Sequence, residues 1–273
     1  MNIRDLIDNY QNAGYEYADA SSKVCQDIIL FEIFNSKFAK NITIKGGVVM
    51  HNISNDVRRA TRDLDFDFIK YSLKDESIKN FIEILNCNND DIKIEIIGNI
   101  KQLHQQDYDG KRVILKLIDK WNFYLETKLD IGVHKDFDIE QEEYCFNLEH
   151  IGKSFNLLVN SKEQIFVEKL KSLLRLGIRS TRYKDLFDFY YLINDTKLNK
   201  DKLYQCIEKY IFNDDKMREK NINDIKKRLH NIFNSTKFKN SLSNPKVNWL
   251  EISIDDAIES ILNYLEELEL TPA

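Results

Sequence analysis

The chain has 273 residues, of which 42% are hydrophobic and 31% are charged, and its formal net charge is −5. This length fits one large domain or two smaller ones, and a composition with two prolines and eight glycines excludes a low-complexity chain. The net negative charge excludes a protein that is basic overall, so a nucleic-acid-binding surface has to be local.

We expect a reduced, cytoplasmic protein. The four cysteines are scattered and form no CxxC motif, which argues against both a zinc site and a disulfide framework. The sequence has no apolar run of about 18 residues or more, so we expect no membrane span. The polar N-terminus lacks the apolar centre of a signal peptide.

The first half of the chain predicts a sheet flanked by helices. Hydrophobic periodicity predicts helices over 22–39 and 76–86. Alternating or β-branched runs predict strands over 41–47, 62–70, 92–100, 111–118 and 122–133. The first strand ends in a Gly-Gly turn, after which a helix is expected to begin.

The second half predicts helices, with a loop over 241–248. The expected helices cover 161–177, 183–194, 200–212, 215–234 and 255–268. The fold class is therefore α+β, in which a mixed β-sheet flanked by helices is followed by a helical domain. We place the first domain, with its N-terminal helices, at residues 1–155 and the helical domain at 156–273.

One strand carries an unusual series of acids. In RDLDFDF, Asp63, Asp65 and Asp67 alternate with apolar residues, so the three carboxylates are expected on one face of the strand. Two carboxylates so placed can hold Mg²⁺, and Asp130 on the polar face of a later strand can add a third. The alternative is a solvated acidic face, although Asp is depleted in strands.

The turn before this strand also has two interpretations. Gly46 and Gly47 allow the backbone to approach a ligand closely, and the N-terminus of a following helix would offer N–H groups to a phosphate. On its own, the pair fits a plain tight turn equally well. Its value comes from the order of strand, Gly-Gly turn, helix and acidic strand.

That order resembles the nucleotidyltransferase superfamily. Within it, the segments KGGVVM, RRATRDLDFDF, KLDI and VEKLKSLLRLGIRSTRYKDLFDFYYL resemble the AbiEii family over about residues 40–195. These are nucleotidyltransferase-like toxins of type IV toxin–antitoxin and abortive-infection systems.

The resemblance implies specific roles for residues of this chain. The metal ligands would be Asp63, Asp65 and Asp130, joined as catalytic residues by Lys169 and Asp185. The nucleotide-binding residues would be Lys45, Gly46, Gly47, Arg62, Lys169 and Asp188. Val48 departs from the family pattern, because a Ser or Thr usually follows the glycines. The extra Asp67 leaves open whether Asp63 and Asp65 or Asp65 and Asp67 form the metal-binding pair, and the family frame favours the first.

Lys169, Asp185 and Asp188 also have structural interpretations. The lysine can reach a triphosphate or extend to solvent, and the two acids can complement a helix dipole. The segment 169–184 holds six basic residues and no acid. It is interpreted as an anion-binding surface for nucleotide phosphates or RNA, or as a solvated basic face.

The implied reaction uses Mg²⁺ (or Mn²⁺) and moves a nucleoside monophosphate from an NTP to an acceptor hydroxyl. The acceptor would be RNA, with tRNA as the attractive candidate, or a protein, and the partner of the toxin would be an antitoxin protein. The alternatives are an antibiotic-type, small-molecule nucleotidyltransferase and a nucleotide-binding module without turnover.

Overall fold

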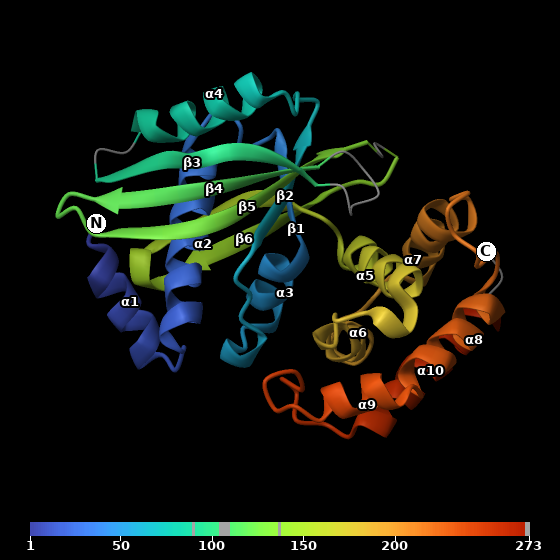
Figure 1. Cartoon of the computed structure of the whole chain (residues 1–273). Helices are drawn as coiled ribbons and strands as arrows, with labels where there is room; N and C mark the ends of the chain where they lie inside the picture. The colour runs from blue at the N-terminus through green and yellow to red at the C-terminus, as the bar shows by residue number, and fades with distance from the viewer. Residues whose placement is uncertain (89–90, 104–109, 136–137, 271–273) are drawn as a thin grey trace. The chain divides into compact units, whose positions relative to one another are not determined.

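A computed structural model describes residues 1–88, 91–103, 110–135 and 138–270 of the chain. The chain divides into two compact units, Met1–Asn160 with the sheet and Ser161–Ala273 with helices (Figure 1). This confirms the predicted α+β fold class. The predicted boundary between residues 155 and 156 falls inside the last strand of the sheet, and the limits of the folding domains stay a prediction.

The described strands of the first unit form one seven-stranded sheet in the order β3-β4-β5-β2-β1-β7-β6. Their bounds are β1 Ile42–Lys45, β2 Leu64–Ile69, β3 Ile92–Leu103, β4 Gly110–Asp119, β5 Tyr124–His134, β6 Glu142–Leu148 and β7 Lys153–Val159. The sheet is mixed, because β2 pairs antiparallel with β1 and parallel with β5. The acidic strand β2 is thus the middle strand of the sheet.

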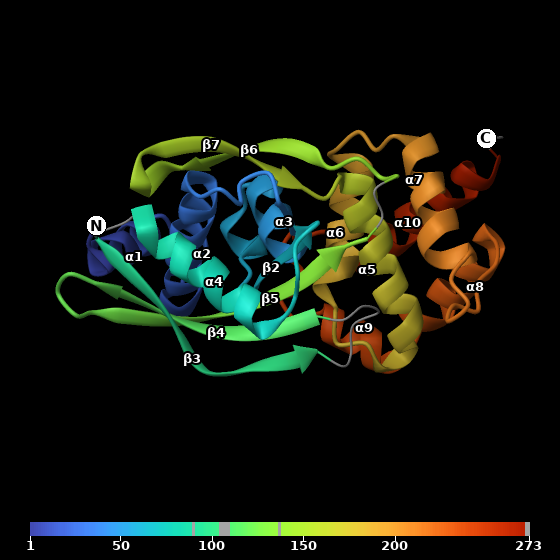
Figure 2. The same ribbon diagram turned by 90° about the horizontal axis from the view of Figure 1, so that it is seen from above.

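Among its described residues, this unit has four α-helices. They are α1 Ile3–Asn12, α2 Tyr17–Asn35, α3 Gly46–Ser54 and α4 Asp75–Leu85. Figure 2 shows α2, α3 and α4 between the β6–β7 end and the β3–β4 end of the sheet.

The apolar face of β2 lies in the core. Phe66 and Phe68 are fully buried, and their rings lie 5.6 and 5.3 Å from the ring of Phe81 in α4. Each such side chain contributes about 1.5–3 kcal/mol by leaving water. This burial fixes the register of β2 and directs its aspartates to the opposite face.

The second unit holds the helices of the C-terminal half. They are α5 Lys162–Leu176, α6 Lys184–Asn194, α7 Lys200–Ile207, α8 Ile222–Phe233, α9 Thr236–Leu242 and α10 Ile254–Leu270. A π-helical turn, Glu208–Phe212, follows α7 directly. The predicted helix 200–212 therefore changes its hydrogen-bond pattern near residue 208, and the predicted helix 215–234 begins only at Ile222.

Several elements differ from the sequence predictions. Helix α2 begins at Tyr17, five residues before the predicted start, with Asp19 in its first turn, where an acid complements the helix dipole. Helix α9 extends to Leu242, inside the predicted loop. The hairpin of β6 and β7 and helix α1 were not predicted, although Phe146 and Leu148 alternate as a strand requires and are buried.

Among the described residues, every helix is too short or too polar to span a lipid bilayer.

Candidate active site

The acidic face of β2 takes part in a row of charges across the sheet. Asp65 pairs with Lys45 of β1 on one side and with Asp130 of β5 on the other, and Asp130 pairs in turn with Arg112 of β4. Directly paired residues on neighbouring strands share a face. These four residues, which we call the charged row, therefore place two carboxylates side by side between two cations.

The three aspartates of the motif have different surroundings. Asp63 precedes β2, and Asp67 lies opposite Gly132, which offers no carboxylate. The ammonium nitrogen of Lys45 lies 2.7 Å from Oδ1 of Asp67, and both side chains are almost completely buried. Asp65 is thus the aspartate of β2 that lies directly beside Asp130, while Asp67 is held by Lys45.

The two glycines are required by close contacts within the chain. Gly46 has a φ of +69°, and a Cβ there would lie 2.7 Å from Oδ2 of Asp65. A Cβ on Gly47 would lie 2.6 Å from the hydroxyl of Thr61. The pair begins α3 directly after β1 and lets the first turn of this helix approach the Asp65 carboxylate. Val48, the next residue, is fully buried and has no access to a ligand.

Arg112 is the main partner of Asp130. Its Nε and Nη2 donate hydrogen bonds of 2.7 and 2.6 Å to the two carboxylate oxygens. This two-point contact, and then the charges of Asp130, Asp63 and Asp65, raise the pKa of Arg112. The structure therefore places Asp130 against one guanidinium, whose side chain is 36% exposed and whose pKa the charges of Asp63 and Asp65 also raise.

The sequence analysis missed Arg112. A usable signal existed in the hairpin of β4 and β5, whose turn pairs Ile118 with Tyr124. Counting six residues outward from that pair brings Arg112 opposite Asp130. The hairpin register, which was not predicted, would have revealed the pair.

The carboxylates fit a hard cation in their chemistry, because Mg²⁺ prefers oxygen ligands and is often bound by one or two carboxylates. The arrangement of these carboxylates, however, does not form such a site. Among the described residues, no group of three or more His, Cys, Asp or Glu side chains is placed so that it could hold a metal ion. Both oxygens of Asp130 are engaged by Arg112, so a metal ion would have to displace this arginine.

Arg62 lies away from the charged row. Its Nε donates a 2.7 Å hydrogen bond to Oδ1 of Asp19 in α2, which raises the pKa of Arg62. Its side chain is 61% exposed. The Arg62 guanidinium is therefore directed to α2, and Lys45 directs its ammonium to Asp67.

In the second unit, Lys169, Asp185 and Asp188 form a buried ion cluster. The lysine Nζ lies 2.7 Å from Oδ1 of Asp185 and 2.8 Å from Oδ2 of Asp188. The indole of Trp249 donates a 3.1 Å hydrogen bond to Asp188, and Arg182 binds the other oxygen of Asp185. The three motif residues do meet, but they bind one another.

The basic residues of segment 169–184 lie in different surroundings. Lys169 and Arg182 belong to the buried cluster, and Lys171 pairs with Asp214 at 2.6 Å. Arg175 and Arg179 are exposed. The segment is therefore not one continuous basic face.

The mixed sheet, the Gly-Gly start of α3 and the acidic middle strand beside Asp130 agree with the architecture expected of a nucleotidyltransferase, an enzyme that transfers a nucleotide to an acceptor. The sequence profile of the family "Nucleotidyl transferase AbiEii toxin, Type IV TA system" matches residues 28–258. The chain belongs to this family. Membership implies an NTP substrate and an antitoxin partner.

The remaining comparisons add less. The chain is similar to the crystal structure of an antigenic nucleotidyltransferase-like protein from Paracoccidioides brasiliensis, with 14% identity and a TM-score of 0.39. The match covers 88% of this chain and 92% of that one. The sequence matches no curated protein.

Proposed function

We propose that this enzyme transfers a nucleoside monophosphate from an NTP to a hydroxyl of RNA, with tRNA favoured, or of a protein. The transfer would require Mg²⁺ or Mn²⁺, take place in the cytoplasm and be the toxic activity. The charged row carries the proposal, because Asp65 of the middle strand lies beside Asp130 of β5 and close to the glycine start of α3.

The metal ligands in this proposal are Asp65 and Asp130, with Asp63 as a third. A bound Mg²⁺ would supply charge neutralisation for the triphosphate and the developing alkoxide. Asp130 would hold the metal in place of Arg112, whose guanidinium would then be free to bind the negatively charged triphosphate. Gly46 and Gly47 would present backbone N–H groups at the start of α3.

The reaction balances without a further reactant. The acceptor oxygen forms a bond to the α-phosphorus, and the bond from this phosphorus to the oxygen bridging the β-phosphate breaks. Pyrophosphate leaves with that oxygen, and Asp130 accepts the proton of the acceptor hydroxyl. Such catalysis depends mainly on positioning and on stabilising charge.

A catalytic role for the cluster depends on whether its lysine can reach the triphosphate. The cluster consists of Lys169, Asp185 and Asp188. A contact between Lys169 and the triphosphate requires that a phosphate replace one of its two carboxylate partners. Without that exchange, the cluster acts by holding α5 and α6 together.

The test is a label-transfer assay with magnesium and each NTP labelled in its nucleoside monophosphate. Separate reactions contain tRNA, total cell protein or an aminoglycoside, and each is repeated with Asp65→Ala. We expect label on tRNA or protein with the wild type and none with the variant.

Each other outcome contradicts part of the proposal. Label on the aminoglycoside alone would indicate a small-molecule enzyme. Nucleotide binding without transfer would indicate a module without turnover. Transfer that survives in Asp65→Ala would refute the metal assignment.

A further inference from the structure

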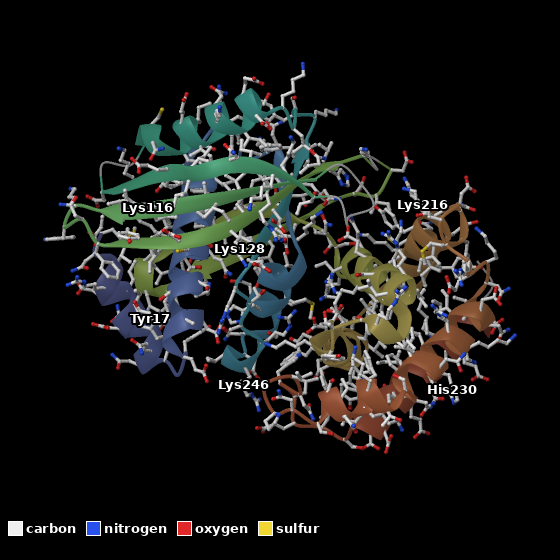
Figure 3. The ribbon with its side chains drawn as sticks, in the orientation of Figure 1. Tyr17, Lys116, Lys128, Lys216, His230 and Lys246 are labelled. Atoms are coloured by element: carbon white, nitrogen blue, oxygen red, sulfur yellow. The ribbon has the colours of Figure 1, made fainter. Side chains whose placement is uncertain are left out.

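The second unit contains a basic pocket that the proposed reaction does not use. Its volume is about 440 Å³, and its lining includes Arg175, Arg179, Lys216, Arg218 and Arg228. The lining also includes one acid, Glu219, which is buried. We call this feature the basic pocket; Figure 3 labels Lys216.

The cations of the basic pocket come from three separate segments. Arg175 and Arg179 lie at the end of α5 and in the turn after it, Lys216 and Arg218 lie before α8, and Arg228 lies within α8. The five cations around this pocket repel one another, and the lining holds one acid, Glu219. A bound polyanion would offset this repulsion at several points at once.

The guanidinium of Arg228 lies close to the backbone of Gly177. Its Nη2 lies 2.8 Å from where a Cβ on Gly177 would be, and Gly177 has a φ of +56°. A larger residue at this position would be strained and would also push the guanidinium away. In the part of the chain that the structure describes, the buried Nε of Arg228 has no hydrogen-bond partner. A buried donor without a partner is costly, and an anion would satisfy it.

Apolar groups complete the lining. Leu176 and Ile178 are 44% and 58% exposed, and both line the basic pocket beside the arginines. The cations of the basic pocket, next to exposed apolar side chains, suit a ligand with repeated phosphates and flat apolar groups. Single-stranded nucleic acid combines these two features.

We propose that the basic pocket binds the phosphodiester backbone of the RNA acceptor, with a base or ribose lying against Leu176 and Ile178. This inference rests on the proposed function only in taking RNA as the acceptor. Binding here would hold the RNA through charge and would carry little sequence preference.

The test measures binding of a fluorescent single-stranded RNA of mixed sequence to the full chain by anisotropy. EDTA is present and NTP is absent, so the reading is independent of metal binding and of catalysis. The variants are Arg218→Gln, on an exposed position, and Arg228→Gln, with Arg228→Lys as the charge-preserving version. Lys227→Gln, on an exposed position of the same helix as Arg228, is the matched control.

We expect each Arg→Gln variant to weaken RNA binding about tenfold, as the loss of one charge-assisted contact does. The slope of log K against log salt should fall by about one per lost contact. Arg228→Lys should lose less, and Lys227→Gln should bind like the wild type. Unchanged fluorescence of the buried Trp249 would show that the variants fold.

Equal RNA binding by all the variants and the control would overturn the proposal. It would also be overturned if tripolyphosphate or a polyglutamate peptide, but not RNA, bound in an Arg218-dependent manner. These outcomes are separable from failure of the proposed function, because Asp65→Ala should abolish label transfer and leave this RNA binding intact.

Discussion

The two units of this enzyme treat their motif charges in opposite ways. In the sheet unit, the carboxylates of the charged row reach Arg112, whose side chain is 36% exposed. In the helical unit, Lys169 is 6% exposed and is bound by two carboxylates that are also buried. The first arrangement can exchange a partner for a ligand, whereas the second is closed.

The physical reason is desolvation. The Arg112 guanidinium is partly exposed, so water can solvate it when it leaves Asp130. A buried pair loses its hydration, so removing one partner leaves an uncompensated charge in the interior. We therefore expect substitution of the half-buried Asp65 to affect activity more than stability, and substitutions in the Lys169 cluster to do the reverse.

The largest expected effect on stability is at Lys169. Lys169→Met leaves Asp185 and Asp188 without their shared cation and should lower the free energy of unfolding by about 3–5 kcal/mol. Urea unfolding would be followed by the fluorescence of Trp249, which bonds Asp188, in a Trp121→Phe background. Lys226→Met is the control, because its pair with Glu266 is more exposed and should contribute at most about 1 kcal/mol. Equal losses in both variants would contradict the contrast between the two units.

The largest expected effect on activity is at Asp65. Asp65→Asn keeps the shape of the side chain but removes its charge, so label transfer should fall at least about 10²–10³-fold. The urea midpoint should stay near that of the wild type, because Asp65 is only half-buried. Full activity in Asp65→Asn would remove the charged row from the mechanism.

Two glycine substitutions separate the effect of backbone strain from the effect of contact with Asp65. Gly46→Ala and Gly98→Ala both place a side chain at a φ close to +70°, which costs about 1–2 kcal/mol. Only the first also forces a Cβ against the Asp65 carboxylate, since nothing lies within 4 Å of the second. We expect similar strain in both, but a further loss of stability and of transfer activity in Gly46→Ala alone. Identical behaviour would show that Gly46 has no special relation to Asp65.

The last expected effect is a dependence of the stability of the sheet unit on pH, which arises from His51. Burial, and then the charges of Lys23 and Arg59, lower the pKa of His51 in α3 to about 3. In the unfolded chain this pKa is about 6.5, so the unfolded state takes up a proton that the folded state does not. Stability should therefore fall as the pH drops below about 6.5, by up to about 1.4 kcal/mol per pH unit.

Urea unfolding of the wild type and of His51→Gln at pH 7.5, 6 and 5 would measure this contribution. The variant should lose less stability than the wild type as the pH falls. The same pH dependence in both proteins would show that His51 is not held neutral in the fold.

The sequence was informative wherever a local pattern carried the signal. The alternation in RDLDFDF located β2 within two residues, and the Gly-Gly pair located the start of α3 within two residues, since both glycines belong to this helix rather than to a turn before it. The partners of the charges depend instead on strand and helix pairing, which a local pattern does not contain. For this reason the sequence did not predict that Arg112 binds Asp130 or that Lys45 binds Asp67. Nor did it predict that Lys169 forms ion pairs with two aspartates of the next helix.

We propose that Arg112 occupies the position of a cation that Asp65 and Asp130 would bind. Mn²⁺ titration followed by electron paramagnetic resonance, without nucleotide, tests it directly. Arg112→Gln should bind Mn²⁺ several-fold more tightly than the wild type, Asp65→Asn should bind it more weakly, and the exposed Arg58→Gln should match the wild type. Equal affinity in all four proteins, or weaker binding in Arg112→Gln, would contradict the account.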